Sequence, residues 1–77
     1  MIDDRPTVRS VIRGPFSYVI THYFENDSEW VRVEEFFATK RQNIWEYSCL
    51  DKAAAMRIGD QVILNRRARR AEVEATL

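Results

Sequence analysis

The sequence has few of the residues that most often carry covalent chemistry. It contains one cysteine, Cys49, and one histidine, His22, in 77 residues. A single cysteine excludes a disulfide within the chain, and a free thiol is typical of a reducing compartment, so we expect the cytoplasm. Metal sites and catalytic triads need further ligands or an orienting acid. We therefore expect structural roles for both residues, with no metal, no cofactor and no catalytic residue.

Glycine and long apolar runs are also scarce. The two glycines, Gly14 and Gly59, stand 45 residues apart, which excludes a glycine-rich phosphate loop. No run approaches the ~20 apolar residues of a membrane span, and residues 1–10 carry acidic residues and a proline where a signal peptide would have an apolar core. We expect neither an enzyme nor a membrane partner.

The chain has no excess of charge of either sign. Twelve basic and twelve acidic residues give a formal net charge of zero, and 45% of the residues are hydrophobic. This composition is typical of a folded globular domain, and it argues against a protein that coats nucleic acid through bulk charge. We expect one domain over residues 1–77. Its small core leaves room for a homodimer, because a second copy would add buried surface.

The clearest local signal is a β-hairpin over residues 16–38. Residues 16–24 are rich in β-branched and aromatic side chains, residues 25–28 have turn chemistry, and residues 29–38 are again compatible with a strand. A turn centred on Asn26 and Asp27 fixes the register. The implied cross-strand pairs are Tyr23 with Trp30, Thr21 with Arg32, Ile20 with Val33, and Phe16 with Phe37.

The two faces of this hairpin differ in polarity. One face is apolar and should receive a helix, while the other is mixed. Residues 39–43 are expected to form a polar turn, and Ile44–Ser48 a third strand. Residues 1–13 are expected to be a mobile arm or a short strand, because Gly14 and Pro15 end that run. The apolar face comprises Phe16, Tyr18, Ile20, Val31, Val33 and Phe37; the mixed face includes Thr21, Tyr23, Trp30, Arg32, Glu34 and Phe36.

Residues 50–75 have the pattern of one long amphipathic helix. Apolar residues between Ala55 and Ile63 fall on one arc, with Gly59 near its middle as a packing glycine. Asp51 or Ser48 can cap the helix. The predicted fold is therefore α+β, with a three-stranded antiparallel meander packed on one long C-terminal helix that extends past the sheet.

Basic residues gather in two places that this topology would bring together. In an up-down-up meander, the helix returns toward the second turn, so the two groups should meet as a basic pole able to bind phosphate or a carboxylate-rich surface. The alternative is a solvated helix end whose cations complement the negative end of the helix dipole. The six residues are Lys40 and Arg41 in the turn, and Arg66, Arg67, Arg69 and Arg70 on the helix.

Three aromatic residues should form a patch on the mixed face of the sheet. Tyr23, Trp30 and Phe36 would either meet a partner or lie beneath the N-terminal arm, Thr7–Ile12. Glu34 and Glu35 are adjacent on one strand and therefore face opposite sides, which excludes a paired acid and base. We expect them to be solvated or paired with a partner.

The order of a hairpin, a third strand over residues 44–48 and a helix from Asp51 resembles the layout of small accessory proteins of phages and mobile elements. Some anti-CRISPR inhibitors are similar. This resemblance covers most of the chain, without a diagnostic motif, and implies a compact inhibitor or accessory protein that docks on a larger host machine. The partner it implies is a protein, including a nucleic-acid-binding complex.

A second resemblance predicts a different fold. Residues 57–64 are similar to the wing hairpin of excisionase-like winged-helix proteins, in which residues 33–38 would begin the first helix and residues 44–55 would be the recognition helix. That resemblance implies a DNA- or RNA-binding module. The conformation of residues 57–64 separates the two folds, because they are helical in one and a hairpin in the other.

Overall fold

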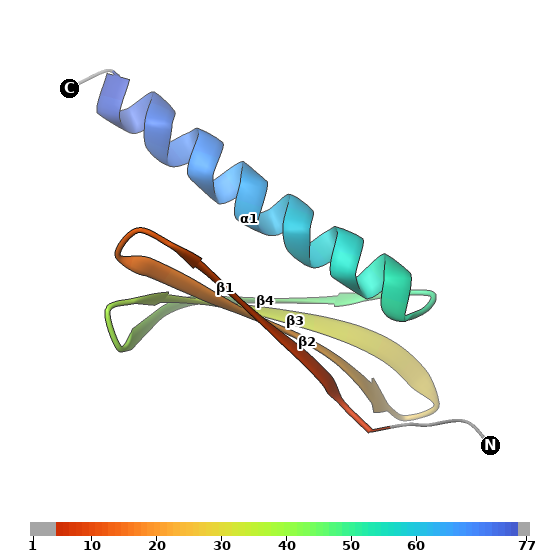
Figure 1. Ribbon diagram of the computed structural model, residues 1–77. Coiled ribbons are helices and arrows are strands. Elements are labelled where there is room, and N and C mark those ends of the chain that lie inside the picture. The colour runs from red at the N-terminus through yellow and green to blue at the C-terminus, as the bar shows by residue number, and fades with distance from the viewer. Residues whose placement is uncertain (1–4, 76–77) are drawn as a thin grey trace.

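The computed structural model describes residues 5–75, which form one antiparallel sheet with a long helix on one face (Figure 1). The strands follow one another across the sheet in chain order, β1-β2-β3-β4. The α+β class is confirmed, but the expected number of strands is wrong, since the sheet has four. The elements are β1 (Thr7–Arg13), β2 (Phe16–Glu25), β3 (Ser28–Phe37), β4 (Lys40–Ser48) and α1 (Lys52–Ala75).

The additional strand is β1, in the segment expected to be an arm or a short strand. Gly14 has a φ of 62°, a left-handed conformation that glycine adopts without strain, and with Pro15 it makes a tight turn. β1 then pairs with β2 along its full length, from Thr7 opposite His22 to Arg13 opposite Phe16. Residues 1–4 of the expected arm lie outside the described residues.

The β2–β3 hairpin has the predicted register. Asn26 and Asp27 have φ values of 52° and 61°, as a type I′ turn requires at both central positions. Asn and Asp tolerate this conformation better than other residues with a side chain. All four predicted cross-strand pairs are present.

The expected turn at residues 39–43 is wrong, because the chain reverses over only Ala38 and Thr39. Ala38 has a φ of 55°, and its backbone N–H donates to the Pro15 carbonyl at 3.0 Å, which ties this turn to the β1–β2 turn. Residues 40–43 belong to β4, an exposed edge strand. Its polar side chains therefore concealed the strand pattern.

The helix begins and packs as predicted. The Asp51 side chain accepts a hydrogen bond from the Ala54 backbone N–H at 2.7 Å, the usual N-cap contact. A Cβ atom on Gly59 would lie 2.6 Å from Cδ1 of Ile20, so only glycine permits this approach. Residues 57–64 are helical, which excludes the winged-helix fold.

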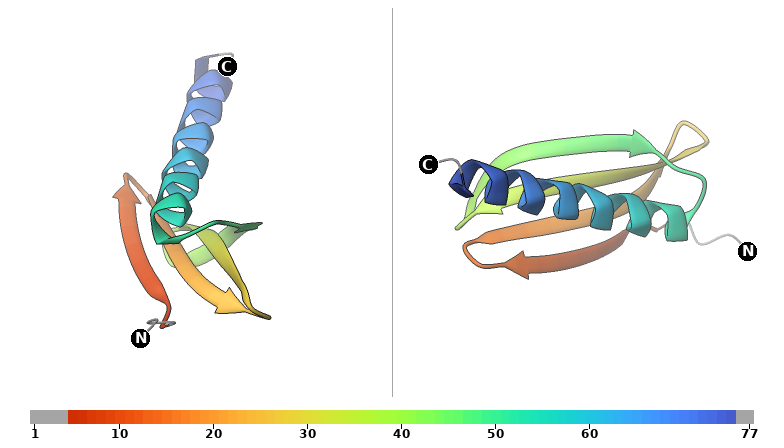
Figure 2. Two further views of the ribbon diagram at one scale, coloured as in Figure 1. Left: turned by 90° about the vertical axis from the view of Figure 1, so that its right-hand side faces the viewer. Right: turned by 90° about the horizontal axis from the view of Figure 1, so that it is seen from above.

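The core lies between α1 and the face of the sheet predicted to receive it. Tyr18, Ile20, Val31 and Val33 are fully buried there, and Ala55 and Ile63 pack on them from the helix. The helix runs along the sheet with β1 and β2 on one side and β3 and β4 on the other, and its C-terminal part rises away from the sheet (Figure 1 and Figure 2). Within the described residues, no helix combines the length and apolar character needed to cross a membrane.

Candidate functional site

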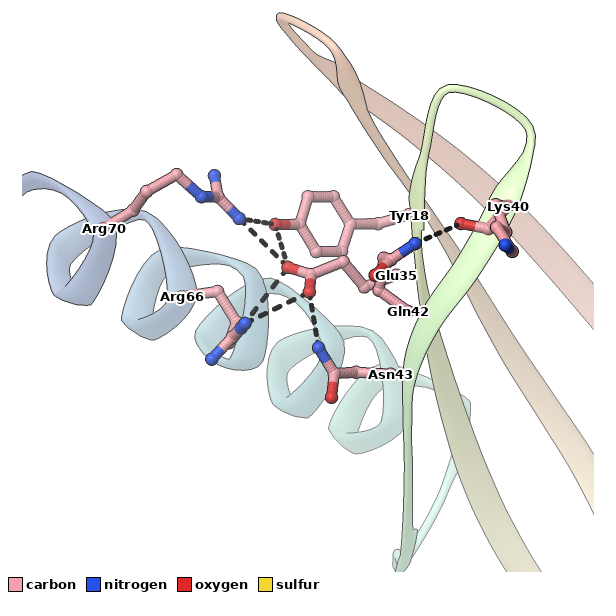
Figure 3. Close-up of polar contacts among 7 residues, drawn as sticks. All are labelled: Tyr18, Glu35, Lys40, Gln42, Asn43, Arg66 and Arg70. Carbon is pink, nitrogen blue, oxygen red and sulfur yellow. Dashed lines mark hydrogen bonds and ion pairs between the residues drawn. The ribbon is translucent and has the colours of Figure 1, made fainter.

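The core contains one carboxylate, which belongs to Glu35 on β3. Its side chain is 1% exposed, and it points toward the helix while Glu34 faces the other side of the sheet, as predicted. The Tyr18 hydroxyl donates to one carboxylate oxygen at 2.6 Å, and the Asn43 amide donates to the other at 2.8 Å (Figure 3). The expectation that Glu35 is solvated or held by a partner is wrong, because its partners belong to the same chain.

Two helix arginines complete the contacts of Glu35. Arg66 donates from Nε and Nη2 at 3.3 and 3.2 Å, and Arg70 donates from Nη2 at 3.1 Å. Both guanidinium groups also lie over aromatic rings, that of Arg70 3.5 Å from the centroid of Phe16 and that of Arg66 5.5 Å from the centroid of Trp45. These arginines fasten the helix to the sheet.

The surroundings of this cluster move the pKa values of two groups. Burial by itself would raise the pKa of Glu35, but hydrogen bonds from Arg66, Tyr18 and Asn43 outweigh it and hold the pKa below its ordinary value. Burial and the hydrogen bond to Glu35 raise the pKa of Tyr18. At neutral pH the cluster therefore contains an ionised carboxylate and a neutral phenol.

The six cations of the predicted basic pole do not share one surface. Arg66 and Arg70 turn inward to Glu35, whereas Arg41 pairs with Glu34 at 3.2 Å on the opposite face of the sheet. Lys40 lies at the turn end of β4, apart from the two inward arginines in Figure 3. The remaining two, Arg67 and Arg69, are exposed on the helix.

A different group of arginines lines a groove of about 510 Å³ between β1 and α1, which we call the arginine groove. Arg9 pairs with Asp60 at 3.0 Å, and Arg13 donates to the Ile12 carbonyl at 2.8 Å. The sequence analysis predicted only one of its arginines as a site residue, Arg67. The alternation of Arg9, Val11 and Arg13 places the two strand arginines on one face once residues 7–13 form a full strand. The arginines of the groove are Arg9, Arg13, Arg57 and Arg67.

The three residues of the predicted aromatic patch lie on the face of the sheet away from the helix, Tyr23 opposite Trp30 near the β2–β3 turn and Phe36 six residues along β3 from Trp30. Tyr23, Trp30 and Phe36 are all partly exposed there. The N-terminal segment does not fold over them, because β1 pairs edge to edge with β2 in the plane of the sheet. We call this surface the open face, since no described residue of the chain covers it (Figure 2).

The charged groups on the open face neutralise one another. Glu46 accepts a hydrogen bond from the Tyr23 hydroxyl at 2.7 Å and lies 3.7 Å from Nε of Arg32, which in turn covers the Tyr23 ring. Arg41 is paired with Glu34. The open face therefore combines aromatic area with balanced charge.

His22 and Cys49 have surroundings that fit structural roles. His22 is buried, and its Nε2 lies 3.0 Å from a carboxylate oxygen of Glu29. Burial and the nearby charges of Glu29 and Asp51 raise the pKa of the Cys49 thiol, which disfavours the thiolate that a nucleophile needs. Residues 5–75 contain no group of three potential metal-ligating side chains placed to hold an ion.

Comparison of the chain with models of known protein families, with curated protein sequences and with solved structures finds no match. The function must therefore be argued from the surfaces themselves.

Proposed function

We propose that this chain is a non-enzymatic binding module, an accessory or inhibitory protein that docks on a larger macromolecular assembly through its open face. One observation carries the proposal: a whole face of the sheet is left uncovered by the described chain although it bears three aromatic side chains. Aromatic residues are enriched at protein–protein interfaces, and a large uncovered apolar surface is unusual on a monomer.

The chemistry of the open face favours a protein over a nucleic acid as its partner. Its arginines, Arg32 and Arg41, lie beside the carboxylates of Glu46 and Glu34, so little positive charge remains for phosphates. The same face also carries the exposed aliphatic side chains of Val8, Ile12 and Ile44. Aromatic and aliphatic side chains around ion-paired polar groups suit a protein partner better than a phosphate backbone.

The size of the open face is sufficient for such an interface. Four strands spaced by ~4.8 Å and about 30 Å long give a flat area of roughly 500–600 Å². Because side chains project from the sheet, its accessible area is larger than this flat area and approaches the ~800 Å² that each partner contributes to a standard interface. The proposed surface is this face and not the six-cation pole, because Arg66 and Arg70 are engaged within the fold.

Site-specific photocrosslinking tests this proposal. A photoreactive residue at Phe36, on the open face, should give a discrete adduct with another protein in cells that produce the chain. The same residue at Leu50, which is 88% exposed outside the sheet, is the control and should not. Phe36→Asp should abolish the complex, and Leu50→Asp should leave it intact.

Two results would contradict the proposal. Equal crosslinking from both positions would show that the open face has no specific partner. An adduct of only twice the 9.1 kDa mass of the chain would show that a second copy occupies the face instead.

A further inference from the structure

We infer that the arginine groove between β1 and α1 binds the phosphodiester backbone of single-stranded nucleic acid. This site is separate from the open face, because Arg9 and Arg13 lie on the helix side of β1. The inference goes beyond the proposed docking function and does not depend on it.

The groove continues into a second pocket. This pocket, of about 260 Å³, shares Arg13 and Arg67 with the first and adds Arg70 and the Gly14 turn. The groove and this pocket together form one track, which follows the helix from Arg57 to Ala71 for about 21 Å at ~1.5 Å per residue. Such a length is comparable with the shortest single-strand sites, of about four nucleotides.

The charge along this track is strongly unbalanced. Among the described residues, the only carboxylate that lines it belongs to Asp60, which is paired with Arg9. Arg57 and Arg67 make no ion pair with any described residue. Within residues 5–75, the Arg13 side chain donates a hydrogen bond only to a backbone carbonyl. Three guanidinium groups on two facing elements are thus available to an anion, in a chain whose net charge is zero.

The form of the track favours a phosphodiester chain over an acidic peptide. An extended peptide directs alternate side chains to opposite sides, so only every second carboxylate could face the arginines. A nucleic acid strand carries a charge at every unit, and guanidinium forks match phosphate oxygens in pairs. The exposed apolar side chain of Leu64 also lines the groove and can contact sugars.

Fluorescence anisotropy with a labelled oligothymidylate of about twelve nucleotides tests the inference. If Arg13, Arg57 and Arg67 each neutralise one phosphate, raising the salt from about 50 to about 200 mM should weaken binding about 20-fold. The double variant Arg57→Ala with Arg67→Ala should retain only about a threefold salt effect. Both side chains are exposed, so circular dichroism should match that of the unmodified chain.

The matched control is Arg69→Ala, which removes an exposed helix arginine outside the groove and should keep the full salt dependence. Absence of binding at about 50 mM salt overturns the inference. An unchanged salt dependence in the double variant, or equal competition by a polyglutamate peptide of the same charge, also overturns it. Phe36→Asp should leave oligonucleotide binding intact, so the two proposals can fail separately.

Discussion

Replacing Glu35 with glutamine should destabilise the protein far more than the same change at its neighbour Glu34. The Glu35 carboxylate accepts five hydrogen bonds from four side chains, two of which are arginines. Glutamine keeps the shape but removes the charge and turns one acceptor oxygen into a donor. The new amide NH2 then faces Arg66 and Arg70, which can only donate, so neither arginine can accept its hydrogen bonds.

The expected loss of free energy of unfolding depends on how deeply each member of the ion pairs is buried. Removing one member of a buried ion pair costs about 3–5 kcal/mol. The Arg66 and Arg70 side chains are 34% and 27% exposed, so water can replace part of what they lose. We expect a loss of about 2–3 kcal/mol, which in a domain of this size lowers the melting temperature by about 10–20 °C.

Urea unfolding followed by circular dichroism measures this loss as a shift of the midpoint at unchanged slope. Glu34→Gln is the control, because Glu34 pairs on the open face with Arg41, which is 56% exposed, and should cost about 0–1 kcal/mol. Equal losses in the two variants, or a Glu35→Gln loss below about 0.5 kcal/mol, would refute the argument that the buried cluster holds the helix on the sheet.

The remaining predictions concern pH and individual contacts. The folded state lowers the pKa of Glu35 below its ordinary value of 4.5. The contribution of Glu35 to stability is therefore present above pH 4.5 and is lost as the pH falls through the folded pKa. Unfolding measured at decreasing pH should show this loss in the unmodified chain and not in Glu35→Gln. Gly59→Ala should lower stability by up to about 2 kcal/mol despite the better helix propensity of alanine, since its Cβ would collide with buried Ile20. Asp51→Ala should cost about 1 kcal/mol and Asp51→Ser much less, because serine can also cap the helix. Alkylation of Cys49 at pH 8 should be slower than that of an unhindered thiol and should accelerate in urea, because burial raises its pKa.

The parts of the fold that could be predicted are those that a local sequence pattern specifies. The β2–β3 register followed from strand composition and from Asn26 and Asp27, which accept the left-handed turn conformation. The helix, its cap at Asp51 and the close packing at Gly59 followed from its apolar arc. β1 was underestimated because Gly14 and Pro15 were interpreted as the end of a run, although the same pair makes a tight turn between two strands.

The candidate sites were predictable only in part, and the aromatic patch was the predictable one. Alternation along a strand is enough to place Tyr23, Trp30 and Phe36 on one face. The arginine groove required a correct β1, because Arg9 and Arg13 face Arg57 and Arg67 only when residues 7–13 are a strand beside the helix.

The sequence by itself determined the strands β2 and β3, the long helix and the polarity of the two sheet faces, because side-chain periodicity and turn chemistry act over a few residues. Tertiary structure alone decided which arginines are engaged within the fold and which remain available. Arg66 and Arg70 meet Glu35 across 31 and 35 residues of chain. Whether a cation faces a carboxylate or solvent depends on that long-range packing, which no local pattern of charge encodes.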